Sequence, residues 1–351
     1  MRLLVVTQKV DRNDPVLGFF HRWLEEFAKN VENLSVICLQ EGEHSLPKNV
    51  QIYSLGKERG ALRLKYVLNF YRLLWQLRGS YDSVFVHMNQ VYVLLGGIFW
   101  RIKRIPVGFW YAHRAKGLSL KIAEKFANVI FTNTQMSFRT DSKKVVLMGH
   151  GIDTKAASRP QDHKVERKQN SILCVGRLTP IKDQETIVRA CEIVSSAYPQ
   201  TRCTFVGGPA TSDDQIYIKH LEDIISRSPA KNIFKFTGEM KQDKLFPQYW
   251  ESGVHINACP TGGMDKVVIE AAVGGAIPVV SNKSFETFLV PYGDRLIFPA
   301  GDFKALAKLI EELFASSDRE EMRSSLRDKA VNNFDVGILI TKIMNWYETS
   351  K

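Results

Sequence analysis

The stretch "CPTGGMDKVVIEAAVGGAIPVVS", from Cys259 to Ser281, decides the fold of this chain. It reads as the end of an apolar strand, a glycine-bearing loop, a short helix and a second apolar strand. A strand that continues through a helix into another strand is the repeating unit of a parallel sheet. Its helix carries Glu270 close to the loop, where open parallel sheets bind their ligands.

The same alternation of short β-branched runs and amphipathic segments extends over the whole chain. The strand-like runs of the first half are "RLLVVTQ", "LSVICLQ", "SVFVHM", "PVGFWYAH" and "NVIFTNT", and those of the second half are "SILCVGR", "RCTFVGG", "NIFKFTGE", "VHINACP" and "AIPVVSN". This order predicts an α/β protein with two doubly wound, Rossmann-like domains. Because ligands of such sheets bind beyond the carboxyl ends of the strands, we expect the site in a cleft between the domains.

A polar segment without periodicity separates the two halves and predicts the domain boundaries. We expect an N-terminal domain on the acceptor side over residues 1–155, a linker over 156–170 and a C-terminal domain over 171–334. The apolar pattern of residues 335–351 predicts a last helix that packs back on the first domain.

Composition limits the class of protein. The net charge of +11 and the pI near 9.3 favour an anionic partner, which is a nucleic acid, an acidic membrane or a phosphorylated substrate. The 5 cysteines form no C-x-x-C pair and indicate reduced core thiols. The first residues read as a strand rather than a signal peptide, and the apolar run from Val91 to Trp100 is too short to span a bilayer. We therefore expect a cytoplasmic protein with at most peripheral membrane contact.

Several catalytic motifs are missing from the sequence. There is no G-x-G-x-x-G after the first strand, no G-x-x-x-x-G-K-S/T, no H-E-x-x-H and no G-x-S-x-G. No nucleic-acid recognition motif accompanies the basic charge, so nucleic acid is the poorer explanation for it. The absence of D-x-D gives no indication of a carboxylate-bound metal, and we expect neither a metal nor a cofactor.

Two cations follow the strand "SILCV" in the segment "GRLTPIKD", from Gly176 to Asp183. Arg177 and Lys182 can converge on one diphosphate, the first as a planar fork and the second as a point charge. The alternative is a basic loop in water, which the spacing alone favours.

The loop before Glu270 offers a second anion site. Gly262 and Gly263 free the backbone at the start of the helix, and the N–H groups of a helix N-terminus attract anions. Asp265 and Lys266 lie in its first turn, and Glu270, one turn deeper, can accept hydrogen bonds from both hydroxyls of a ribose. The alternative is a surface Glu paired with a nearby Lys.

Together these segments resemble the retaining glycosyltransferases of family 4, which have the GT-B fold. The resemblance is carried by "GRLTPIKD", "FTGEMKQDKL" and "GGMDKVVIEAAVGGAIPVV", with support from "VLMGHGID" and "RLIFPAGD", and it covers nearly the whole chain. It implies that the C-terminal domain binds a nucleotide diphosphate sugar, that Arg177 and Lys182 bind the donor diphosphate, and that Glu270 binds the ribose.

The sequence departs from the family at position 262, where the first Glu of the family's E-x7-E motif is replaced by glycine. Asp265 is the nearest candidate to replace that Glu in catalysis. The resemblance also places a histidine near the donor sugar, which falls on His113. The remaining residues that it assigns to donor binding are Gly18, Gly176, Gly238, Glu239, Met240, Gly262, Gly263, Met264, Lys266 and Val267.

Histidines and one aspartate of the first domain are further, weaker candidates. Asp14 and His21 flank the glycine loop around Gly18 and are candidates for the acceptor side. His87 and His150 end strand-like runs, as His113 does. For each of these histidines the alternative is a polar residue that ends a strand.

The segment from Lys57 to Arg78 is basic and rich in Leu, Tyr and Trp. As a helix it places Lys65, Asn69, Arg72 and Gln76 in a narrow polar stripe, opposite an apolar arc of Leu62, Val67, Phe70, Tyr71, Leu74 and Trp75. A helix on an anionic membrane surface has this composition. So does a helix buried between a sheet and its neighbours, which is the favoured interpretation.

Together with these residues, the resemblance implies a metal-independent glycosyltransferase that moves a sugar from a nucleotide diphosphate sugar to a glycan or lipid-linked acceptor with retained anomeric configuration. A nucleotide-sugar epimerase on the same fold is one alternative. A non-catalytic protein that binds nucleotide sugars is the other, because the first Glu of the family's motif is absent.

Overall fold

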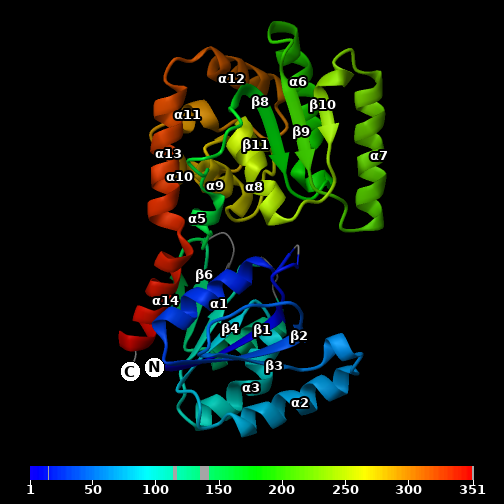
Figure 1. Ribbon diagram of the computed structural model, residues 1–351. Coiled ribbons are helices and arrows are strands. Elements are labelled where there is room, and N and C mark those ends of the chain that lie inside the picture. Colours follow the sequence, from blue (N-terminus) through cyan, green and yellow to red (C-terminus); the bar gives the residue numbers. More distant parts are fainter. Residues whose placement is uncertain (15, 114–116, 135–141, 350–351) are drawn as a thin grey trace. The chain divides into compact units, whose positions relative to one another are not determined.

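The computed structural model describes residues 1–14, 16–113, 117–134 and 142–349, which fold into two compact units (Figure 1). The first unit consists of Met1–Asp153 and Val336–Lys351, and the second of Thr154–Asp335. Each unit contains a parallel sheet with helices on both faces. The predicted α/β class with two doubly wound sheets is confirmed.

The first unit is built on a seven-stranded sheet within the described residues, in the order β3-β2-β1-β4-β5-β6-β7. Its strands, all parallel, are β1 (Arg2–Val10), β2 (Asn33–Glu41), β3 (Val50–Ser54), β4 (Ser83–His87), β5 (Val107–Trp110), β6 (Val129–Thr132) and β7 (Val145–Leu147). Its helices are α1 (Phe19–Asn30), α2 (Arg63–Gln76), α3 (Gln90–Ile102), α4 (Leu118–Phe126) and α14 (Val336–Thr349).

Alternating side chains of β1 fill two separate cores in the first unit. Leu3 and Val5 belong to the core under α1 and α14, whereas Leu4 and Val6 belong to the core under α2, α3 and α4. Tyr347 of α14 is fully buried, and its hydroxyl donates to the carbonyl oxygen of Val84 at 2.6 Å. The last helix is therefore anchored to the first sheet beside α1 (Figure 1).

The second unit has a five-stranded parallel sheet within the described residues, in the order β10-β9-β8-β11-β12. The strands are β8 (Lys168–Val175), β9 (Arg202–Val206), β10 (Phe234–Phe236), β11 (Ser252–Asn257) and β12 (Ile277–Val280). The helices are α5 (Thr154–Ala157), α6 (Gln184–Ala197), α7 (Ser212–Arg227), α8 (Gln242–Glu251), α9 (Lys266–Gly274), α10 (Glu286–Leu289), α11 (Gly293–Leu296), α12 (Phe303–Ala315) and α13 (Arg319–Phe334).

Residues 156–170, expected as a linker, lie inside the compact second unit, which begins at Thr154. The reason is that polar groups tie this segment to α8, β11 and α9. The guanidinium of Arg167 donates to the carbonyl oxygens of Tyr249, Ser252 and Gly274, at 3.1, 2.6 and 2.9 Å. Burial lowers the pKa of Arg167 to about 9. The charged, non-periodic segment 156–170 therefore has well-defined hydrogen-bond partners in the second unit.

The chain order fixes where each sheet can bind a ligand. In the second unit the chain runs from β8 outward to β9 and β10, then returns to the other side of β8 with β11 and β12. The loops after β8 and β11 consequently diverge and leave room beyond the carboxyl ends of these two strands. The corresponding point in the first unit lies between β1 and β4.

Candidate functional site

The two predicted anion-binding segments of the second unit meet at this point. The first follows β8 and contains Lys182, and the second follows β11 and ends in Asp265, directly before α9. The ammonium of Lys182 donates to Asp265 Oδ2 at 2.5 Å, and the side-chain amide of Asn257 donates to the same oxygen at 2.9 Å. Both side chains of the ion pair remain partly exposed to solvent. The structure therefore brings together residues that are 83 positions apart in sequence.

Arg177 lies at the start of the same loop and is exposed. Its backbone carbonyl accepts a hydrogen bond from the buried side-chain amide of Gln184 at 2.9 Å, which anchors the loop to the first turn of α6. Lys182 is thus placed against a carboxylate, while the guanidinium of Arg177 extends from an anchored backbone at the same strand end.

Glycines at the ends of β8, β9 and β10 let three loops approach one another closely. Gly207 has φ +139°, and a Cβ atom there would lie 1.9 Å from the carbonyl oxygen of Gly176, so no other residue fits. The N–H of Gly207 donates to the carbonyl of Gly238 at 2.9 Å. Of the next two predicted residues, Glu239 is exposed and packs its side chain beside Gly208, and Met240 is half-buried.

The glycine at position 262 has a structural reason of its own. Its φ is +112°, a backbone conformation that side chains with L configuration rarely adopt. Asn282 follows β12, and its side-chain amide donates to the carbonyl oxygen of Gly262 at 3.3 Å and towards that of Gly263 at 3.5 Å. Met264, directly before Asp265, is half-buried. The loop conformation therefore suits glycine and would strain the glutamate that the family resemblance expects.

Helix α9 carries two ionisable groups four residues apart, the half-buried Lys266 and the buried Glu270. Burial raises the pKa of Glu270, which Lys266 and a hydrogen bond from the Tyr249 hydroxyl at 3.4 Å partly offset. Burial also lowers the pKa of Lys266 to about 7, against the opposing effect of Glu270. Glu270 is only 8% exposed, and Val267 beside it is half-buried. A desolvated carboxylate whose hydrogen bond from Tyr249 is this long retains capacity to accept from a bound diol.

Three residues at or beside this site are not predicted from the sequence: Tyr249, His255 and Asn257. His255 lies on β11 and is fully buried, and neither ring nitrogen has a hydrogen-bond partner among the described residues. Burial lowers its pKa to about 3, so the ring is neutral. It lies in register with Leu173 of β8 and Pro278 of β12. The only signal in the sequence is a histidine and an asparagine within the apolar run "VHINACP".

Two predicted residues of the first unit are His113, which follows β5 at the carboxyl edge of the sheet, and Gly18, which precedes α1. His113 is exposed beyond the end of β5, with its ring centroid 5.7 Å from that of Tyr111. Gly18 directly precedes α1, and its N–H donates to the carbonyl of Asp14 at 2.9 Å. A Cβ atom at Gly18 would lie 2.5 Å from that carbonyl oxygen, so the tight turn requires glycine.

The weaker candidates of the first unit have structural partners. Asp14 accepts from the ammonium of Lys9 at 2.7 Å and from the N–H of Leu17 at 2.7 Å. His21 lies 3.2 Å from a carboxylate oxygen of Glu25. The other two histidines are buried: His87 Nδ1 contacts the hydroxyl of Thr7 at 3.2 Å, and His150 Nε2 contacts the amide of Asn133 at 2.9 Å. Each of these four side chains therefore has a partner within the first unit, which accounts for its position without a ligand.

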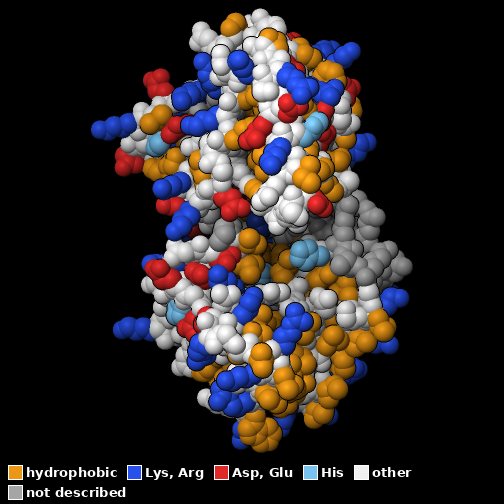
Figure 2. Space-filling view, turned by 90° about the vertical axis from the view of Figure 1, so that its right-hand side faces the viewer, with side chains coloured by type: hydrophobic (Ala, Val, Ile, Leu, Met, Phe, Trp, Pro, Cys, Tyr) orange, Lys and Arg blue, Asp and Glu red, His pale blue; other side chains and the backbone are white. Residues whose placement is uncertain are grey.

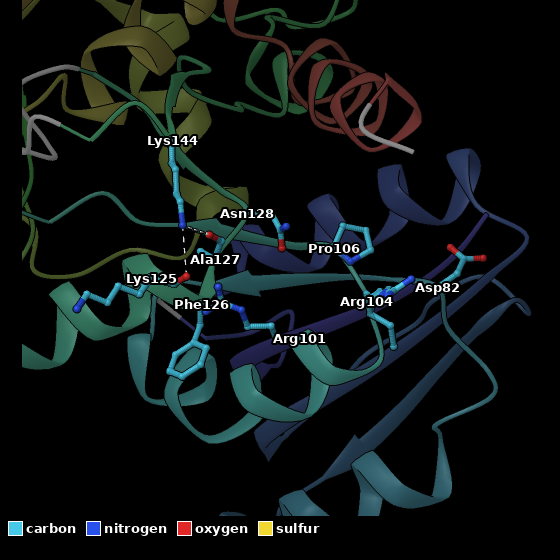
Figure 3. Close-up of a pocket in the computed structure, with 10 residues that line it drawn as sticks. Asp82, Arg101, Arg104, Pro106, Lys125, Phe126, Ala127, Asn128 and Lys144 are labelled. Carbon is cyan, nitrogen blue, oxygen red and sulfur yellow. Dashed lines mark hydrogen bonds between the residues drawn. The ribbon is translucent and has the colours of Figure 1, made fainter.

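A hollow of about 660 Å³ lies elsewhere, at the amino ends of β4, β5 and β6 in the first unit (Figure 3). It is lined by Asp82, Arg101, Arg104, Ile105, Pro106, Lys125, Phe126, Ala127, Asn128 and Lys144. None of the predicted site residues lines it. Ligands of doubly wound sheets bind at the opposite, carboxyl edge, so we do not assign the donor to this hollow.

Comparison with known proteins relates the second unit to one family and the whole chain to solved structures. Residues 169–316, which lie within the second unit, match the family model "Glycosyl transferases group 1". The matched range includes the loops after β8 and β11 and the whole of α9. No curated protein matches the chain in sequence.

Solved glycosyltransferase structures share the fold over the full length of the chain. HepE of Anabaena in complex with UDP is 18% identical with a TM-score of 0.78, and the alignment covers 99% of this chain and 100% of HepE. Sucrose-phosphate synthase of Thermosynechococcus elongatus is 15% identical with a TM-score of 0.75 and coverage of 99% of both chains. A glycosyltransferase of Rickettsia africae is 13% identical with a TM-score of 0.71 and coverage of 99% of both chains. The fold is therefore GT-B.

Proposed function

We propose that this protein is a retaining glycosyltransferase of family 4, which moves a hexose from a nucleotide diphosphate sugar to a glycan or lipid-linked acceptor in the cytoplasm. The observation that carries the proposal is the ion pair of Lys182 with Asp265 at the point where β8 and β11 diverge, inside the matched domain. HepE, which has the same fold, was solved with UDP and with UDP-glucose, which supports a nucleotide sugar as the donor.

In this proposal the protein supplies the positive charge that the departing diphosphate needs. Arg177 and Lys182 bind the phosphate oxygens, together with N–H groups at the start of α9. Glu270 accepts from the ribose hydroxyls. In this proposal the charge balance requires no carboxylate-bound metal.

The proposed reaction retains the anomeric configuration. The bond from the anomeric carbon to the diphosphate oxygen breaks, and the acceptor oxygen forms a bond to the same carbon on the same face. The acceptor proton passes to the departing phosphate oxygen, so charge and atoms balance without a nucleophilic side chain. His113 and Asp265 are proposed to contact the donor sugar.

The test is turnover of nucleotide diphosphate sugars by the full chain in the presence of a chelator. We expect slow release of nucleoside diphosphate from the matching donor, faster release with an acceptor, and no loss of activity on chelation. Conversion of the donor to an epimer without acceptor would assign the protein to the epimerases. Binding of the donor without any hydrolysis or transfer would make it a non-catalytic binding protein.

A further inference from the structure

Helix α2 exposes an unbroken apolar stripe on its outer side. Leu64, Leu68, Tyr71 and Trp75 recur at intervals of four, three and four residues, which places them on one face of the helix. All four are exposed, and Leu64 is 71% and Trp75 63% accessible. The opposite face, with Phe70, Leu73 and Leu74, packs in the core.

The neighbouring helices extend this surface. Helices α2, α3 and α4 cover the same face of the first sheet, because residues from all three belong to one core. Their outer sides therefore point away from the sheet in a common direction. The exposed apolar side chains of α3 and α4 are Val91, Ile98, Ile102, Leu118 and Ile122. We call the outer side of these three helices the α2–α4 face.

Cations surround the apolar side chains of the α2–α4 face. The exposed ones on or next to the three helices are Arg63, Lys65, Arg72, Arg78, Arg101, Lys103, Arg104, Lys121 and Lys125. The carboxylates of the sequence from Leu62 to Phe126 are Asp82, which pairs with Arg2, and Glu124. Figure 2 shows orange hydrophobic side chains beside blue Lys and Arg in its lower half, which draws the first unit.

We propose that the α2–α4 face docks on an anionic lipid bilayer. Apolar side chains enter the boundary between headgroups and acyl chains, and the surrounding cations bind the anionic headgroups. Arg101 and Lys125 also line the hollow of Figure 3, so the basic edge of the face continues into it. None of the described helices is long and apolar enough to cross a membrane.

The charge of the face argues against a second copy of this chain as the occupant. In a two-fold dimer the same patch contacts itself, so the cations of one copy would lie against those of the other. Like charges brought together in this way oppose association. A nucleic acid would satisfy the cations but would leave the row of Leu, Ile and Trp side chains without an apolar partner.

The experiment is sedimentation of the full chain with vesicles. Vesicles of phosphatidylglycerol and phosphatidylcholine in equal parts should carry the protein down, and vesicles of phosphatidylcholine alone should not. Salt at about 1 M, which reduces the screening length to about 3 Å, should weaken binding at least tenfold. Equal binding to both vesicles, or no binding to either, overturns the proposal.

Two pairs of substitutions separate the apolar and the charged contributions. Leu64→Ser with Leu68→Ser should weaken partitioning at least about tenfold, because both side chains insert. Lys65→Glu with Arg72→Glu should weaken it at least about 25-fold, at about fivefold per lost cation. The matched control is Ile216→Ser on α7, which is exposed to 69% in the second unit and should leave partitioning unchanged. Partitioning of either pair equal to that of the unsubstituted protein overturns the proposal.

Trp75 gives a readout that does not depend on substitutions of the leucines. Trp75 is exposed, whereas the other tryptophans are buried or half-buried. Vesicles with brominated acyl chains should quench its emission, and Trp75→Phe should remove the quenching. Absence of quenching overturns the inserted geometry. A concentration-dependent dimer that Leu64→Ser with Leu68→Ser dissociates would instead assign the face to a second copy.

Discussion

Asp265 forms an ion pair with Lys182, the cation that we assign to the donor diphosphate. Its carboxylate accepts from Lys182 and Asn257, so a bound diphosphate competes with Asp265 for the lysine. Asp265→Asn should therefore bind nucleoside diphosphate at least as tightly as the unsubstituted protein, because a nearby negative charge is removed. Turnover of the sugar donor should fall at least about tenfold if Asp265 replaces the missing glutamate.

Calorimetric titration and initial rates separate these two effects. Loss of diphosphate affinity in Asp265→Asn, equal to that of Lys182→Ala, would mean that Asp265 only orients the lysine. Unchanged turnover would remove Asp265 from the catalytic residues.

Glu270 is proposed to accept from the ribose. Glu270→Gln should weaken binding of a ribonucleoside diphosphate by roughly 10-fold to 100-fold, since each hydrogen bond to a charged group is worth about 1.5–3 kcal/mol. The 2′,3′-dideoxy nucleotide should bind both proteins equally, because it has no hydroxyls to donate. Glu222→Gln on the exposed side of α7 is the control. Equal weakening for both nucleotides would show that Glu270 supports the loop and not the ribose.

Gly262 adopts a left-handed backbone conformation at a position where the family resemblance expects glutamate. Gly262→Ala and Gly262→Glu should each destabilise the second unit by about 1–2 kcal/mol and lower its Tm by a few degrees. Gly79→Ala is the matched control, since its φ lies outside the left-handed region and a Cβ atom there meets nothing within 4 Å. An unchanged Tm for Gly262→Glu would mean that the loop accepts the family's residue without strain.

At the scale of the helix, Lys266 and Glu270 of α9 make stability depend on pH. The pKa of Lys266 is lowered by burial to about 7 from 10.5, so between these values the unfolded chain binds a proton that the folded chain does not. Stability should therefore rise with pH across this window. The raised pKa of Glu270 has the opposite effect. Above the ordinary pKa of a glutamate the folded chain holds a proton that the unfolded chain has lost, so stability falls as the pH rises.

Lys266→Met should remove the rise in Tm between about pH 7 and pH 10. The measurement is the difference in Tm between the unsubstituted protein and Lys266→Met at each pH. Parallel Tm curves for the two proteins would contradict the lowered pKa of Lys266 in the folded protein.

Helix α2 illustrates what periodicity could and could not predict. The spacing of apolar residues correctly indicated a helix, but the predicted arc placed Tyr71 and Trp75 together with Phe70 and Leu74. The structure divides this arc into a buried face and an exposed face. A pattern with apolar residues on two sides does not reveal which side meets the sheet, because this depends on the shape of the neighbouring core.

At the scale of the whole molecule, the α/β class and the GT-B fold could be predicted from the sequence and are confirmed. Strands and helices alternate locally, so their pattern is visible in short segments. The contact of Lys182 with Asp265 joins loops far apart in sequence. His255, which has no hydrogen-bond partner among the described residues, lies on the strand between β8 and β12. Such features arise from sheet order and register, which local patterns do not encode.

The proposed donor site is tested most directly by calorimetric titration of the protein with UDP and with uridine, in the presence of a chelator. We expect UDP to bind without metal, and Arg177→Ala and Lys182→Ala each to weaken UDP roughly 10-fold to 100-fold while affecting uridine little, because the lost contacts are to phosphate. Failure of UDP to bind without a divalent metal, or equal losses for UDP and uridine, would contradict the account.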